Sequence, residues 1–206
     1  FLNLLDSGTP QQLSDYVATL HRRPVLRGYD QHARLTAKLD QSVPDRDYYA
    51  RQTYLALVRL AAALGVVRLF NPEQPGNYLY LESDQTDEML NGALTALNVT
   101  RDLPRSGGGA YGLETSRGLL SLRHIIALGY LREIRSFLNH AGRSYDQIVE
   151  IGGGFARTAF HAARDLGLRY SIIDLPAVGV TQYLMLRGNG VRANLWSDEI
   201  HAAGHV

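Results

Sequence analysis

Cysteine is absent from the 206-residue sequence, which excludes disulfides, thiolate zinc sites and iron–sulfur clusters within it. This absence agrees with a cytoplasmic location, which we expect. Long apolar runs are also missing. A membrane helix needs roughly 18 apolar residues, and the best candidate here, residues 55–67, is interrupted by Arg59. We therefore expect no membrane partner.

The sequence also lacks a large excess of either charge. Lysine and arginine total 21, aspartate and glutamate total 20, and the formal net charge is +1. Proteins that bind a nucleic-acid backbone usually carry a basic patch or stripe, so we do not expect a nucleic-acid partner. The hydrophobic fraction of 45% is enough for one ordinary domain, or for a small helical domain and part of another.

Residues 1–143 are expected to form a mostly helical region. Apolar residues recur there at helical spacing, and the strongest early segment is followed by Gly65, a typical helix stop. The stretch 101–112 is rich in glycine and too long for a simple connector, so we expect a loop there. The expected helices span residues 11–22, 30–39, 45–64, 84–97 and 116–139.

The hydrophobic period changes in residues 144–206. Residues 147–151 form a short β-branched run, which is typical of a buried strand. Strand–helix–strand–helix–strand is the start of a doubly wound parallel α/β sheet, so we expect the first half of a Rossmann-like domain. The expected helices span residues 157–166 and 178–186, and the expected further strands span 170–174 and 191–196.

Two features of this region carry chemistry. A glycine-rich motif, Glu150-Ile151-Gly152-Gly153-Gly154, follows the first expected strand, where glycines permit a tight turn and close approach of a ligand to the backbone. Asp174 ends the next expected strand, where an acid can hydrogen-bond both hydroxyls of a ribose. Together they predict a nucleoside site at the carboxyl ends of parallel strands. The simpler alternative is a structural turn, with Asp174 only capping the next helix.

The residues around the glycines help to distinguish S-adenosylmethionine (SAM) from NAD(P). The dinucleotide fingerprint is G-x-G-x-x-G/A. Gly152 and Gly154 fill its first two positions, but Arg157 occupies the third, where it would hinder close packing of helix on strand. Glu150 is unfavourable beside a pyrophosphate and favourable beside a cationic sulfonium. We therefore expect SAM as the cofactor, with an NAD(P)-dependent oxidoreductase as the alternative.

These motifs resemble a known family. Residues 148–154 and Ile172-Ile173-Asp174-Leu175-Pro176 resemble class I SAM-dependent methyltransferases, and the glycine triplet with a later Asp-Leu-Pro is similar to O-methyltransferases. More narrowly, the chain resembles a family of sugar O-methyltransferases over roughly residues 71–186. The resemblance implies O-methylation of a sugar or another small-molecule hydroxyl. Its further matches are residues 109–113, Gly118, Arg123 and Gln182.

The resemblance also implies a role for each cofactor-binding residue. Asp174 would hold the ribose hydroxyls, and Leu175 would contact the adenine. The residues that would line the methionine and ribose side of SAM are Glu150, Gly152, Gly153 and Gly154.

Two further residues lie upstream, in a segment that covers the cofactor in related enzymes. They are Tyr111 and Arg123. The simpler alternative makes Tyr111 and Tyr130 core aromatics and Arg123 a surface or paired charge. One departure concerns the position after the triplet, where the family commonly has another glycine. This chain has Phe155-Ala156-Arg157 there, and Ala156 is small enough to be tolerated.

No catalytic base is identified in the sequence. The fold class has further strands after those expected here, and the chain begins with Phe1, so we expect an N-terminal portion whose catalytic base lies beyond residue 206. Residues 1–143 are expected to build the acceptor pocket or a homodimer interface. His201 and His205 have the spacing of a helical metal site but no evident third ligand, so we expect no metal. A non-catalytic, methyltransferase-like binding module is the remaining alternative.

Overall fold

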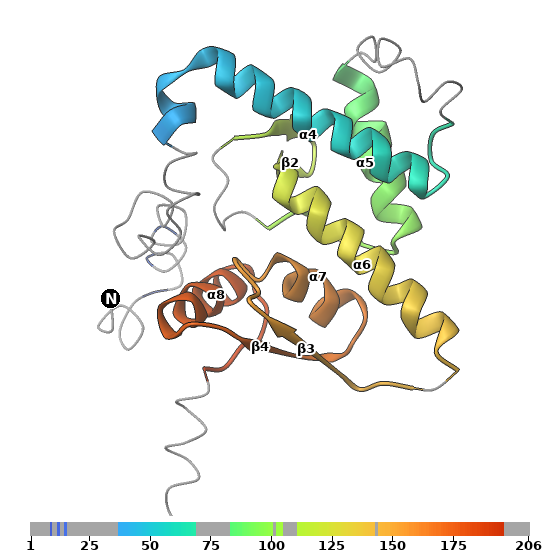
Figure 1. Ribbon diagram of the computed structural model, residues 1–206, viewed down its shortest axis with the longest axis vertical. Helices are drawn as coiled ribbons and strands as arrows, with labels where there is room; N and C mark the ends of the chain where they lie inside the picture. Colours follow the sequence, from blue (N-terminus) through green and yellow to red (C-terminus); the bar gives the residue numbers. More distant parts are fainter. Residues whose placement is uncertain are drawn as a thin grey trace, which may run out of the picture. The chain divides into compact units, whose positions relative to one another are not determined.

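The computed structural model describes residues 37–68, 83–100, 102–104, 111–142 and 144–195, together with Thr9, Gln12 and Asp15. In these residues, helices are combined with two small sheets, one antiparallel and one parallel (Figure 1). The chain divides into two compact units, which we describe separately. The described residues of Leu35–Leu103 and Gly109–Ser144 form the helical unit, and those of Tyr145–Val206 lie in the α/β unit.

The helical unit contains α4 (Val43–Ala63), α5 (Ser83–Ala96) and α6 (Leu122–His140), and residues 37–41 are helical as well. Ser42 begins α4, because its side-chain oxygen accepts a hydrogen bond from the Asp45 backbone N–H at 3.3 Å. Both α5 and α6 contact α4. The sequence prediction of helices at 45–64 and 84–97 is confirmed. The largest fully buried side chains of the unit are Leu57, Leu90, Leu94, Leu97, Leu120, Leu128 and Leu131.

The first residues of the expected helix 116–139 form a β-hairpin instead. β1 (Leu113–Thr115) pairs antiparallel with β2 (Gly118–Leu120). Gly118 has a φ of +104°, which favours a turn over a continuous helix. The helix α6 begins only after Ser121, whose side-chain oxygen accepts a hydrogen bond from a backbone N–H of the first turn. The prediction of a helix from residue 116 was therefore wrong, because these local signals override the apolar spacing.

The α/β unit contains a strand–helix–strand–helix segment. It consists of β3 (Gln147–Ile151), α7 (Arg157–Asp165), β4 (Arg169–Ile173) and α8 (Pro176–Gly188). The two strands are parallel neighbours, with Ile151 opposite Ile173. The carboxyl ends of both strands therefore meet at one edge of the sheet. The predictions of these two strands and two helices are confirmed.

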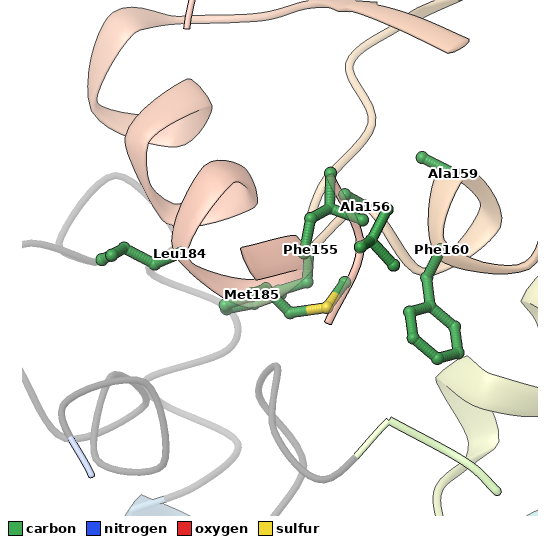
Figure 2. Packing of buried hydrophobic residues seen from close by; sticks show 8 residues of the cluster. Phe155, Ala156, Ala159, Phe160, Leu184 and Met185 are labelled. Atoms are coloured by element: carbon green, nitrogen blue, oxygen red, sulfur yellow. The ribbon is translucent and has the colours of Figure 1, made fainter. Parts of the chain in front are cut away.

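A hydrophobic cluster joins α7 and α8 (Figure 2). Both helices lie on the same side of the sheet (Figure 1). The side chains of Tyr170 and Ile172 on β4 pack against this cluster. The helices thus cover the sheet face that carries these two residues. The buried members of the cluster are Phe155, Ala156, Ala159, Phe160, Leu184, Met185, Leu186 and Val191.

The opposite face of the sheet is exposed. Val149, Ile151 and Ile173 are 56%, 83% and 59% exposed, respectively. Side chains alternate between the two faces of a strand, so helices on one side leave these residues uncovered. The prediction of a buried strand at 147–151 was therefore wrong for this face.

A third strand does not form at 191–195, the described part of the expected strand 191–196. Val191 instead closes the end of α8. Its backbone N–H donates to the carbonyl oxygen of Leu186 at 2.9 Å, and its side chain is buried in the cluster. The third-strand prediction was wrong for these residues, because Val191 packs back on the helix and does not extend beside the sheet.

Some expected features lie outside the described residues. They include most of the helices at 11–22 and 30–39, the loop residues 105–110, and the pair His201 and His205. Among the helices that the structure does describe, none is both long and apolar enough to cross a membrane.

Candidate cofactor site

The glycine turn follows β3 directly. Gly152 and Gly154 have φ angles of +74° and +54°, which glycine adopts without a steric penalty. The Gly152 N–H donates to the Ile173 carbonyl oxygen at 2.9 Å, so the turn begins beside the end of β4. Within the described part of the chain, nothing beyond the adjacent residues lies within 4 Å of where a Cβ would stand at either glycine. The backbone of this turn is therefore open to close approach by a ligand.

Gly153 is required for a different reason. A Cβ at this position would lie 2.7 Å from Cγ2 of Ile172 and 2.8 Å from Oε2 of Glu150. The turn thus packs closely against β4 and against the Glu150 carboxylate. Gly152 and Gly154 therefore leave space for a ligand, whereas Gly153 leaves space for the side chains of Ile172 and Glu150.

Asp174 follows β4 and is partly buried. Its Oδ1 accepts a hydrogen bond from the Leu175 backbone N–H at 2.8 Å, and its Oδ2 accepts one from Nε2 of Gln182 at 2.8 Å. A carboxylate has about four acceptor positions, two on each oxygen. The residues that the structure describes fill one position on each oxygen and leave one open on each, which suits two adjacent hydroxyls.

The contacts of Asp174 also bear on the alternative that it only caps the next helix. The N-cap of α8 is Leu175, and no side chain caps this helix. Pro176 stands at the first helical position, where a missing N–H has no cost. Among the described contacts, the Asp174 carboxylate accepts the N–H of this N-cap residue and the Gln182 side chain, so capping is not its only contact with α8.

The sequence analysis named Gln182 only as a match to the family that the chain resembles and did not predict its contacts. The side chain is 3% exposed. Its Nε2 also donates to the Gly154 carbonyl oxygen at 3.1 Å. One amide group thus connects the acid after β4 to the glycine turn after β3. A signal was available, since a glutamine between Val178 and Met185 at helical spacing predicts a buried amide that needs partners.

Glu150 lies on the covered face of β3 and is partly buried. Its Oε2 accepts a hydrogen bond from the Tyr170 hydroxyl at 3.1 Å. Burial raises the pKa of Glu150, the Tyr170 hydrogen bond lowers it, and the nearby charge of Asp174 raises it, with a net upward shift. Burial and the charge of Glu150 likewise raise the pKa of Tyr170 above its ordinary value.

Neither carboxylate is neutralised among the described residues. No lysine, arginine or histidine described there forms an ion pair with Glu150 or with Asp174. Two neighbouring negative charges at one sheet edge create a negative local potential. Such a potential attracts a cationic ligand and disfavours a phosphate group.

The predicted site residues fall into both units. Glu150, the three glycines, Asp174 and Leu175 come together in the α/β unit, where Leu175 is 70% exposed. Tyr111 and Arg123 belong to the helical unit. The Tyr111 hydroxyl donates to the Asp40 carboxylate, and Arg123 is exposed on the first turn of α6.

Tyr130, considered as a core aromatic, is 56% exposed, so that alternative was wrong for it. The side chain stands on α6 and points away from the core of the helical unit. Tyr111 is partly buried, in keeping with its hydrogen bond to Asp40.

Arg157 occupies the position of the third glycine in the dinucleotide pattern. It begins α7, is 8% exposed, and holds its guanidinium 5.2 Å from the centre of the Phe155 ring. The residue before it, Ala156, is fully buried and has a left-handed backbone with φ of +53°. The helix therefore begins with a bulky, buried side chain where a dinucleotide site needs glycine.

No cluster of three potential metal ligands occurs among the described residues. Comparisons with protein-family models, with curated proteins and with solved structures found no match.

Proposed function

We propose that this chain carries the cofactor-binding portion of a SAM-dependent methyltransferase that transfers a methyl group to a small-molecule hydroxyl. The observation that carries the proposal is the position of Asp174. Its carboxylate is linked through Gln182 to the glycine turn, and the described residues leave an acceptor position open on each of its oxygens. This arrangement supports a nucleoside ligand at the carboxyl ends of β3 and β4.

Each predicted binding residue would have a physical task. Asp174 would accept hydrogen bonds from the two ribose hydroxyls. Gly152 and Gly154 would let the ligand lie against the backbone. Glu150 would favour the positive charge of the methionine portion. The exposed side chain of Leu175 would offer an apolar surface to the adenine.

The cofactor would supply an electrophilic methyl group, since its sulfur is already positively charged. The residues of this chain would bind and orient the donor for in-line displacement. A hydroxyl acceptor must also lose a proton, and we assign that task to no residue of this chain. We further propose that the helical unit contributes to the acceptor pocket or to a homodimer interface, and that the acceptor is a sugar hydroxyl, as the resemblance implies.

Two observations favour SAM over NAD(P). The first is the pair of carboxylates without ion-pair partners among the described residues, Glu150 and Asp174, which would repel a pyrophosphate. The second is the buried Arg157 at the third position of the dinucleotide pattern.

Replacing Asp174 by alanine tests the proposal directly. Calorimetric titration of S-adenosylhomocysteine into the protein expressed from its complete reading frame should show weaker binding for D174A. The expected loss is about 1–3 kcal/mol, or roughly 5–150-fold, because the ligand hydroxyls lose a charged acceptor. Unchanged affinity in a folded D174A variant would refute the assignment of Asp174.

Asp146 provides a matched control. It is an exposed aspartate that precedes β3, at the opposite end of the sheet, and its carboxylate pairs with Arg169. The D146A variant removes the same charge from the same unit. It should bind S-adenosylhomocysteine with the affinity of the unsubstituted protein.

A further inference from the structure

We propose that Gln182 is a positioning residue that links ribose recognition by Asp174 to the conformation of the glycine turn. This inference rests on the proposed function, because it assigns to Gln182 the task of fixing the carboxylate that receives the ribose. Gln182 itself would not touch the ligand.

The geometry satisfies the amide nitrogen completely. A glutamine NH₂ group has two donors, and Nε2 of Gln182 has two acceptors: Oδ2 of Asp174 at 2.8 Å and the Gly154 carbonyl oxygen at 3.1 Å. The side chain is 3% exposed, so water cannot readily replace either partner. Losing one acceptor would leave a buried donor unsatisfied, which makes the arrangement costly to disrupt.

Each oxygen of the Asp174 carboxylate accepts a hydrogen bond from a different residue. The Leu175 N–H holds Oδ1, and Gln182 holds Oδ2. A carboxylate held at both oxygens has little freedom to rotate, so its remaining acceptor positions are fixed before a ligand arrives. Such preorganisation raises affinity because less ordering is needed on binding.

The bond to Gly154 also restrains the glycine turn that follows β3. Gly154 has a φ of +54° and precedes the helix α7. Its carbonyl oxygen is held by the same nitrogen that holds Asp174. A movement of the turn would therefore disturb the carboxylate, and a movement of the carboxylate would disturb the turn.

Isosteric variants separate positioning from simple space filling. Q182M retains much of the volume without any donor. Q182E retains the shape but places a second carboxylate against Asp174. The negative charge of Asp174 already raises the pKa of Glu150, so a further carboxylate adds to the repulsion at this site. Gln147 is the matched control: it is exposed, and its Nε2 donates to Oγ of Ser171 at 2.8 Å, outside the site.

The experiment is titration of S-adenosylhomocysteine into the protein from its complete reading frame at about pH 8 and at about pH 5, where facing carboxylates can share a proton. Q182M should bind roughly tenfold more weakly at both pH values. Q182E should bind weakly at the higher pH and recover part of its affinity at the lower one, relative to the unsubstituted protein. Q147E should match the unsubstituted protein at each pH. Both proteins retain Glu150, so any effect of its protonation on affinity is common to them and can be subtracted from the result for Q182E.

The outcomes distinguish this inference from the proposed function. Equal affinity of Q182E and the unsubstituted protein at the higher pH would overturn the positioning role alone, since shape would then suffice. Additive losses in D174N, Q182M and their double variant would overturn it as well, because coupled residues are not additive. Absence of binding by the unsubstituted protein would overturn the proposed function and this inference together. If Q182M does not fold, Q182E and its pH dependence decide.

Discussion

Replacing Ala156 by glycine should change the free energy of unfolding by less than about 1 kcal/mol, although the residue is fully buried. Loss of the buried methyl group costs about 0.8 kcal/mol, and the greater freedom of glycine in the unfolded chain costs about 0.5–1 kcal/mol. Against this, Ala156 has φ of +53° and ψ of +28°. This left-handed conformation costs a residue with a Cβ about 1–2 kcal/mol, which glycine avoids.

Ala159 is the matched control for this prediction. It is 2% exposed and lies inside α7, so A159G removes an equivalent methyl group without relieving a left-handed backbone. The expected loss is about 2 kcal/mol, from burial and helix propensity together. Urea denaturation followed by circular dichroism measures both variants, provided that the m-values agree. Equal destabilisation by A156G and A159G would refute the left-handed start of α7.

Three further substitutions test the packing and charge of the site. G153A should lower the free energy of unfolding by about 1–3 kcal/mol, because its Cβ would crowd Ile172 and Glu150. G179A is the control: among the described residues its Cβ would meet open space, so it should raise the free energy of unfolding by about 0.4–1 kcal/mol in the same urea assay. E150Q should stabilise the free protein at pH above the raised pKa of Glu150, where burial penalises the charged form, and this advantage should fade as pH falls toward 4.5, the ordinary value. The same variant should bind SAM more weakly in calorimetry. A pH-independent stability difference, or a stabilising G153A, would contradict these contacts.

The α/β unit was the most predictable part of the fold. In residues 147–188, the change from strand period to helix period coincides with glycines at the ends of the elements. Gly167, for example, has a φ of +66° and follows α7. Local pattern and tertiary structure agree in this segment, so the elements and their parallel pairing could be predicted.

The errors have local physical causes. Leu119 fits the apolar pattern of a helix as well as that of a strand. The structure resolves the two at Gly118, whose positive φ forms a turn. Periodicity also does not reveal how many layers cover a sheet. Val149 and Ile151 belong to a β-branched run that is typical of a buried strand, yet both are exposed because α7 and α8 occupy one face.

The site could be predicted where chemistry follows from position along a strand. Glu150, the glycines and Asp174 stand at strand ends, so their meeting at one edge follows from parallel pairing. The helical spacing of Gln182 with Val178 and Met185 predicts a buried amide, but it does not predict that Asp174 and Gly154 are its partners. Tyr111 and Arg123 rested on resemblance alone, and the described contact of Tyr111 is with Asp40 in its own unit.

The most direct test of the central claim is calorimetric titration of S-adenosylhomocysteine and of NADH into the protein expressed from its complete reading frame. The proposal predicts that the complete protein binds S-adenosylhomocysteine and does not bind NADH. Binding of NADH, or of neither ligand, would contradict it, because the glycine turn and Asp174 would then serve another cofactor or only the fold.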